Sequence, residues 1–256
     1  MEGMKAVTSM NESSFDAGGL EGNFAGENRS ERSGVRGCLL IHGFTGGPFE
    51  LMPLSRRLAE MGWDCTVPTL AGHENELQRI GAVSYTEWIE GMEREAERMS
   101  KRYGSFDLVG FSMGGLIAAY LANRCPVRRL VLLSTAVVYI SPLRFGRELV
   151  AQIKSGRIRD EAAAKLTGAR WRATLQFMRL VRRLKPELET IRVPTLIVHG
   201  LKDHVVHPYS AKIIERKIKG PKEVRLFPES RHLICLDVEA EAVIDAVAGF
   251  LQRSFF

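Results

Sequence analysis

The sequence predicts an α/β protein with a mostly parallel central sheet and helices on both faces of that sheet. Three observations lead to this fold class. From about residue 35 onward, short apolar segments alternate with longer segments of helical periodicity, several apolar segments are rich in β-branched residues, and a glycine-rich turn joins one strand-like segment to a helix-like one. The 256 residues suit one such domain, because a chain of this length buries roughly three quarters of its unfolded surface.

Several of the apolar segments are short and apolar almost throughout, as expected of parallel strands that are covered on both faces. The predicted strands are Gly37–Ile41, Asp64–Pro68, Phe106–Gly110, Leu130–Ser134, Thr195–His199 and Glu223–Phe227. The predicted helices between and after them are Glu50–Met61, Tyr85–Arg102, Met113–Asn123, Tyr209–Lys219 and Val238–Arg253. This alternation is typical of parallel strands that are joined by crossover helices.

Two parts of the chain depart from the alternation. Residues 1–33 are rich in Gly, Ser, Asn and Glu and have weak hydrophobic periodicity, so we expect a loosely ordered leader. Residues 137–191 show helical periodicity without a strand, so we expect them to form a small helical cap that lies above the sheet. Residues 34–136 and 192–256 then form the core of the domain.

The expected cap contains an amphipathic basic helix. Apolar residues recur at three- and four-residue spacing, at Trp171, Leu175 and Met178 and at Phe177, Leu180, Val181 and Leu184. The basic residues between them are Arg172, Arg179, Arg182, Arg183 and Lys185. The favoured interpretation is a helix that packs its apolar face on the domain and leaves the arginines in solvent. The alternative is a basic face in transient contact with anionic lipid or another interface.

Composition narrows the class of protein further. The hydrophobic share of 45% and the charged share of 26% are those of a globular protein, and the net charge of +6 gives no reason to expect nucleic acid as a partner. Residues 1–34 lack an apolar core of signal-peptide length, and no run of about 20 apolar residues follows, so we expect a soluble, cytoplasmic protein without stable membrane insertion. The four cysteines, which lack a Cys-x-x-Cys pair, are expected to be reduced, mostly buried thiols and not a zinc site: Cys38, Cys65, Cys125 and Cys235.

The glycine-rich turn Gly110-Phe111-Ser112-Met113-Gly114-Gly115 has the layout of a nucleophile elbow. An apolar strand enters it and a helix leaves it. Such a turn raises the serine hydroxyl above the strand ends, and the glycines two residues before and after Ser112 leave room for the tight bend. The turn therefore predicts Ser112 as a nucleophile, provided that a base can take its proton.

Two residues that follow later strands can supply that base and its partner. Asp203 comes just after the predicted strand Thr195–His199, and His232 comes just after Glu223–Phe227. Because the carboxyl ends of parallel strands share one edge of the sheet, these side chains are expected to meet Ser112 there. We predict a catalytic triad in which His232 is the general base and acid and Asp203 orients its imidazole.

Other polar residues near these motifs are expected to have structural and not catalytic roles. His199 lies within a strand and is expected to be a core residue with satisfied hydrogen bonds, and His42 is expected to brace a loop. His204 and His207 share the loop of Asp203 but do not follow the last strand. Glu229 is the rival acid, which we interpret as a loop carboxylate.

Two backbone N–H groups are expected to form an oxyanion hole. Met113 follows the serine and begins the helix. The loop after the first strand contains Gly43, which lets the backbone turn inward, so the N–H of Phe44 is the second expected donor and the Phe44 ring a candidate wall of the acyl pocket. Loss of one such donor typically lowers the rate by about 10²–10³.

These residues together resemble the α/β-hydrolase superfamily, and in particular its small bacterial carboxylesterases and monoacylglycerol lipases, over about 220 residues from Val35. The motifs that carry the resemblance are His-Gly-Phe-Thr-Gly at 42–46, Gly-His at 72–73, Gly-Phe-Ser-Met-Gly-Gly at 110–115, Asp-His-Val-Val at 203–206 and His-Leu-Ile-Cys-Leu-Asp at 232–237. The resemblance implies hydrolysis of carboxylic esters with one hydrophobic acyl chain, no cofactor and a small helical cap. It also implies catalytic roles for Ser112, Asp203 and His232 and oxyanion roles for Phe44 and Met113.

The resemblance is weaker in two places. A loop that usually reads Gly-His-Gly is Gly72-His73-Glu74 here, and the cap is unusually rich in arginine. Caps set the substrate range, so the natural substrate, the chain-length preference and the oligomeric state stay open. Two alternatives keep the same fold: a hydrolase of a lactone, thioester or C–C bond, and a ligand-binding receptor without turnover.

Overall fold

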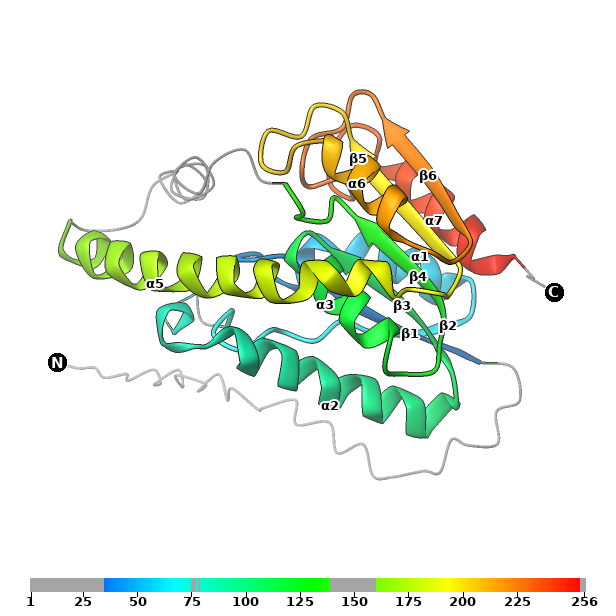
Figure 1. Cartoon of the computed structure of the whole chain (residues 1–256), viewed down its shortest axis with the longest axis horizontal. Helices are drawn as coiled ribbons and strands as arrows, with labels where there is room; N and C mark the ends of the chain where they lie inside the picture. Colours follow the sequence, from blue (N-terminus) through cyan, green and yellow to red (C-terminus); the bar gives the residue numbers. More distant parts are fainter. Residues whose placement is uncertain (1–34, 75–76, 78, 139–159, 254–256) are drawn as a thin grey trace, which may run out of the picture.

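The structure, a computed structural model, describes residues 35–253 except residues 75, 76, 78 and 139–159, and of residues 160–170 only the backbone. Six parallel strands form one sheet in the order β2-β1-β3-β4-β5-β6 (Figure 1). Their bounds are β1 Arg36–Ile41, β2 Trp63–Thr66, β3 Phe106–Phe111, β4 Val127–Leu133, β5 Thr195–Gly200 and β6 Lys222–Phe227. The predicted strands are confirmed, but β2 ends two residues before Pro68, which has no N–H with which to continue a ladder.

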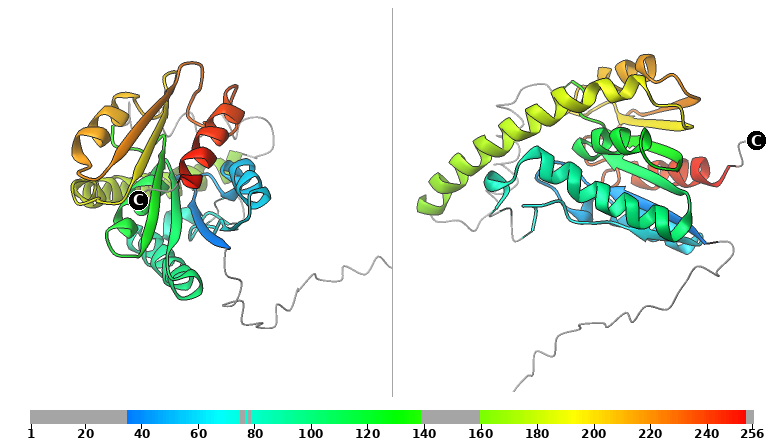
Figure 2. Two further views of the ribbon diagram at one scale, coloured as in Figure 1. Left: turned by 90° about the vertical axis from the view of Figure 1, so that its right-hand side faces the viewer. Right: turned by 60° about the horizontal axis from the view of Figure 1, so that its bottom comes forward.

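Helices cover both faces of the sheet. Their bounds are α1 Met52–Glu60, α2 Tyr85–Tyr103, α3 Met113–Ala122, α5 Asp160–Leu184, α6 Tyr209–Lys217 and α7 Ala240–Gln252. Short 3₁₀ turns lie at η2 Pro48–Glu50, η4 Ile80–Ala82 and η5 Lys185–Glu189. The left view of Figure 2 shows α1 and α7 on one side of the sheet and α2, α3 and α6 on the other.

Alternating side chains of the strands build a separate hydrophobic core on each face. Leu39 and Ile41 of β1 face the cluster that contains α2, α3, α5 and α6, whereas Leu40 faces the cluster of α1 and α7. This follows from the two-residue period of a strand, and burial of both faces explains why the central strands β1, β3 and β5 are almost entirely apolar, whereas the edge strand β6 is largely exposed and carries charged residues. The predicted fold class is therefore confirmed.

The basic helix predicted in the expected cap is part of α5, which packs against α2, α3 and η4 (Figure 1). Phe177, Leu180 and Leu184 are buried, as expected. Val181 is buried as well and Met178 is half-buried, but the prediction was wrong for Trp171 and Leu175, which are 57% and 36% exposed. The domain covers only one side of the helix, so an apolar residue on the opposite side remains in solvent.

The residues predicted as a leader, 1–33, lie outside the described residues, as does part of the expected cap, 139–159. The four cysteines are free thiols. Cys38 and Cys235 are buried, as predicted, whereas Cys65 and Cys125 are half-buried. In the described part of the chain, no helix combines the length and the apolar composition that crossing a bilayer requires.

Candidate active site

Ser112 lies at the junction of β3 and α3, in a strained backbone conformation with φ 53° and ψ −115°. A non-glycine residue with positive φ is uncommon, and such conformations cost of order 1–3 kcal/mol. The neighbouring glycines permit the bend: a Cβ at Gly110 would lie 2.6 Å from the Cα of Gly115, and a Cβ at Gly114 would overlap the carbonyl oxygen of Ile41. The predicted elbow is thus present, and its glycines are required by close backbone contacts.

The three side chains that the sequence placed on separate loops lie in one chain of hydrogen bonds. The Oγ of Ser112 is 3.1 Å from Nε2 of His232, and Nδ1 of His232 is 2.7 Å from Oδ2 of Asp203. All three lie at the carboxyl edge of the sheet, because β3, β5 and β6 run parallel and each residue follows one of these strands. Ser112 and Asp203 are buried.

Asp203 is held in place by its own loop. Its Oδ1 accepts hydrogen bonds of 2.8 Å from the backbone N–H groups of Val205 and Val206. Burial alone would raise the pKa of this carboxyl group, but the neighbouring His232 and His199 hold the pKa well below its ordinary value. Asp203 therefore remains a carboxylate whose second oxygen is directed at His232.

His199 also lies beside Asp203, a contact that the sequence did not indicate. Its Nε2 lies 3.1 Å from the carbonyl oxygen of Val206 and 3.3 Å from Oδ2 of Asp203. The residue is buried, as predicted, but the prediction that its hydrogen bonds are satisfied is met only for Nε2, because Nδ1 has no hydrogen-bond partner among the described residues. Because a carbonyl oxygen can only accept, Nε2 carries the proton and faces the carboxylate.

The other polar residues follow the predictions more closely. Glu229 forms an exposed ion pair with Lys202 and is a loop carboxylate. Nδ1 of His207 accepts the N–H of Tyr209, so this histidine caps the turn that precedes α6. His204 lines a cavity together with His232.

The loop after β1 passes directly beside Ser112. A Cβ at Gly43 would lie 3.2 Å from the Cβ of Ser112 and 3.1 Å from the ring of Phe111, so only glycine fits there without a shift. The N–H of Met113 lies in the first turn of α3, where a helix has no internal partner for it. The two predicted donors, on Phe44 and Met113, thus belong to segments that adjoin the serine.

The Phe44 ring is buried among other aromatic rings. It stacks on Phe177 of α5 with a centroid distance of 5.0 Å and an interplanar angle of 14°, and it makes an edge contact with Trp88 at 5.8 Å. Stacked and edge contacts of this kind contribute about 0.5–1.5 kcal/mol beyond the burial of area. Helix α5 is thereby attached to the loop beside the serine.

Two histidines brace this loop. Nε2 of His42 accepts the N–H of Leu70 at 3.0 Å, so its Nδ1 carries the proton and donates to the carbonyl oxygen of Gly43 at 2.9 Å. Nε2 of His73 accepts the N–H of Thr45 at 3.1 Å. Burial lowers the pKa of His42 to about 3 and that of His73 to about 4, so both are neutral near neutral pH. His42 is therefore a loop brace, as predicted.

Glu50 is a support that the sequence reasoning missed. Its Oε2 accepts the N–H of Gly43 at 2.9 Å, although the residue is buried. Burial raises the pKa of Glu50 to about 7, against hydrogen bonds from Gly43 and Gly47 that lower it. A lone glutamate in a turn gives no sequence signal for such a role. The bracing by His73 was likewise missed, although the motif Gly72-His73 was noted.

A cavity of about 250 Å³ adjoins His232. Its lining combines apolar and polar side chains: His204, Val205, Arg231, His232, Leu233, Leu236 and Asp237. The exposed Arg231 forms an ion pair with the largely covered carboxylate of Asp237 across the turn that carries the histidine. Among the described residues, no group of three His, Cys, Asp or Glu side chains could hold a metal ion.

The fold and this arrangement are those of an α/β hydrolase. The model of the alpha/beta hydrolase family matches residues 38–246, so the chain belongs to that family. It is 29% identical to a thermostable monoacylglycerol lipase of Bacillus sp. (strain H-257) over 233 residues, which cover 86% of this chain and 92% of the lipase. It is 27% identical to a carboxylesterase of Bacillus subtilis (strain 168), with 87% and 94% covered.

A solved structure from a study of two metagenome-derived lipolytic enzymes has the same fold. Its TM-score is 0.70 at 20% identity, and the match covers 86% of this chain and 94% of that one. The predicted resemblance to small bacterial esterases is therefore confirmed at the level of fold and family.

Proposed function

We propose that the protein is a serine carboxylic-ester hydrolase of the carboxylesterase or monoacylglycerol lipase type. One observation carries the proposal: Asp203, His232 and Ser112 are joined by hydrogen bonds of 2.7 and 3.1 Å. Nucleophile, base and orienting carboxylate at these separations are the arrangement that acyl transfer requires.

In the acylation step, Oγ of Ser112 attacks the carbonyl carbon of the ester while Nε2 of His232 takes the hydroxyl proton. The carbonyl oxygen becomes an oxyanion, which accepts hydrogen bonds from the N–H groups of Phe44 and Met113. When the tetrahedral intermediate collapses, the bond to the alcohol breaks and His232 returns the proton to the leaving alcohol. The acyl group then remains on Ser112 as an ester.

Deacylation repeats these events with water as the nucleophile. His232 takes a proton from the water, the hydroxide attacks the acyl carbon, and the serine leaves with the proton from His232. Asp203 stabilises the imidazolium in both steps, and its low pKa keeps it ionised throughout. The brace of Glu50, His42 and His73 holds the loop of Phe44, so its N–H does not need to reorganise when the charge develops.

The proposed substrate class rests on the relatives of the chain more than on the geometry of the site. The two curated relatives act, by their names, as a monoacylglycerol lipase and a carboxylesterase. We therefore propose an ester with one hydrophobic acyl chain, with residues 137–191 as the cap that limits its size. The cytoplasmic location stays a prediction from the sequence.

A fluorophosphonate probe tests the nucleophile, because such probes react with an activated serine and not with an ordinary one. We expect a single adduct on Ser112, located by mass spectrometry, and none in the Ser112→Ala variant. Ser210, which is buried and bonded to Val138, provides the matched control Ser210→Ala. Labelling at another serine, or none, would contradict the proposal.

A panel of nitrophenyl and glyceryl esters tests the reaction class. Turnover of these esters that is lost in Ser112→Ala supports an esterase. Inertness toward every ester, with labelling intact, would favour a lactone, thioester or C–C bond as the substrate. Equal turnover by the wild type and Ser112→Ala would favour a binding protein.

A further inference from the structure

The second half of α5 has one buried and one exposed face. The buried face consists of Ala173, Phe177, Leu180, Val181 and Leu184. The opposite face, named the arginine face here, consists of the exposed residues Trp171, Leu175, Arg179, Arg182 and Arg183 and the half-buried Met178. At about 3.6 residues per turn, positions 171, 175, 178 and 182 form one stripe and positions 179 and 183 lie beside it. Large apolar and cationic side chains are therefore interleaved on one surface.

Among the described residues, one of the three arginines of this face, Arg183, has a carboxylate within 4.0 Å. In the part of the chain that the structure describes, no carboxylate lies within 4.0 Å of Arg179 or Arg182. Arg183 is 4.0 Å from Glu187, but that carboxylate already binds Arg124 through two bonds of 2.8 and 2.9 Å. Like charges three and four residues apart on a helix repel each other and destabilise it. An anionic surface bound to these arginines would reduce that repulsion.

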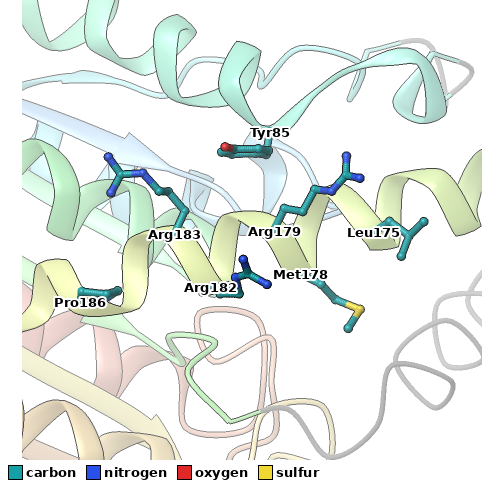
Figure 3. A pocket seen from close by; sticks show the side chains of 7 residues that line it. All are labelled: Tyr85, Leu175, Met178, Arg179, Arg182, Arg183 and Pro186. Carbon is teal, nitrogen blue, oxygen red and sulfur yellow. The ribbon is translucent and has the colours of Figure 1, made fainter.

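A groove of about 930 Å³ adjoins the arginine face (Figure 3). Arg179 and Arg183 extend from α5 toward the side on which Tyr85 lies, at the start of α2. Guanidinium groups bind phosphate oxygens through paired N–H donors, which suits them to lipid headgroups. The groove therefore offers space for headgroups between two cationic side chains.

The apolar members of the face favour a lipid over a nucleic acid, whose backbone offers no aliphatic surface. Trp171 is 57% exposed and Leu175 is 36% exposed. Tryptophan is favoured at the boundary between headgroups and acyl chains, and basic residues beside it are typical of helices that lie in that plane.

We propose that the arginine face is a docking site for an anionic lipid surface. Arg179, Arg182 and Arg183 contact the phosphates, and Trp171 and Leu175 enter the headgroup boundary. The proposal concerns docking and not turnover, so it can fail or succeed independently of Ser112.

Tryptophan fluorescence gives a direct readout. The chain has three tryptophans, of which Trp63 and Trp88 are buried, so a change of emission on addition of vesicles reports Trp171. We expect a blue shift with vesicles of phosphatidylcholine and phosphatidylglycerol, and none with pure phosphatidylcholine. Trp171→Phe should abolish the shift. A shift of equal size with both kinds of vesicle would overturn the electrostatic part of the proposal.

Co-sedimentation with the same vesicles measures the contribution of the arginines. The variant Arg179→Gln/Arg182→Gln/Arg183→Gln should lower the partition coefficient about 100-fold, which corresponds to roughly 3 kcal/mol at about 1.4 kcal/mol per tenfold. The control Arg56→Gln/Lys212→Gln/Lys219→Gln removes the same charge from exposed positions outside the arginine face. It should bind nearly as well as the wild type.

Three outcomes would overturn the proposal: an equal loss in the control, no vesicle binding by the wild type, or tighter binding to single-stranded RNA than to vesicles. A wild-type dimer that the arginine variant dissociates would identify a second copy of the chain as the occupant instead. Circular dichroism and turnover of a water-soluble ester, both unchanged, would show that the arginine variant is folded.

Discussion

Replacement of Glu50 by glutamine is expected to stabilise the protein in neutral and alkaline solution but not in acid. The carboxyl group of Glu50 is buried and accepts a hydrogen bond of 2.9 Å from Gly43. Glutamine keeps an oxygen that can accept this bond, and it has nearly the same shape. What the substitution removes is the negative charge.

The magnitude follows from the pKa of Glu50, which burial raises from 4.5 to about 7. The folded protein therefore binds this proton more tightly than the unfolded chain does. As the pH rises from about 4.5 to about 7, the unfolded chain loses the proton first, and the free energy of unfolding falls by about 3 kcal/mol at 1.36 kcal/mol per pKa unit. Above this pH window the buried charge of Glu50 lowers the free energy of unfolding of the wild type by this full amount. Glu50→Gln has no such charge and loses none of it.

Urea unfolding of both proteins at about pH 5 and about pH 8 measures this difference. Glu50→Gln should exceed the wild type by up to about 3 kcal/mol at the higher pH and by much less at the lower pH. Glu229→Gln is the matched control, since Glu229 is an exposed residue in an ion pair, and it should change stability by at most about 1 kcal/mol at either pH. A gain that is the same at both pH values, or a loss at the higher one, would refute the reasoning.

Three further predictions concern the elbow, the orienting acid and the attachment of α5. Gly114→Ala should impair folding or at least lower the melting temperature, since its Cβ would overlap a carbonyl oxygen of Ile41, whereas Gly249→Ala on α7, where nothing lies within 4 Å, should be tolerated. Asp203→Asn should lower kcat by about 10⁴ while KM changes little, because the amide favours the wrong tautomer of its histidine partner; a kcat near that of the wild type would exclude the role. Phe177→Ala should lower the free energy of unfolding by about 3–5 kcal/mol in urea titrations, because it empties a buried, stacked site, and a change below about 1 kcal/mol would contradict the packing.

The fold and the positions of the site residues could be predicted from the sequence because local patterns encode them. The period of apolar residues separates strands from helices, and the glycines around Ser112 mark a turn that few other residues allow. Asp203 and His232 could be placed because each follows a strand, and parallel strands bring their carboxyl ends to one edge. Their roles in catalysis stay a prediction, which the labelling and turnover experiments test.

The supports of the site could not be predicted in this way. Glu50 is seven residues from Gly43, and His73 is 28 residues from Thr45. Neither hydrogen bond corresponds to a motif or a periodicity that could be recognised in the sequence. The same holds for the outward position of Trp171, since helical periodicity identifies the faces of a helix but not which face the domain covers.

The sequence by itself determined the order of the site motifs along the chain: a serine turn after β3, a loop with an acid after β5 and a histidine after β6. Short-range sterics and periodicity are sufficient for this, because they act between residues that are close in the chain. Only the tertiary structure decided which buried groups hold the loop beside Ser112 and which side of α5 faces solvent. Burial, pKa shifts and exposed charge depend on what distant segments place around a side chain, and packing alone sets those surroundings.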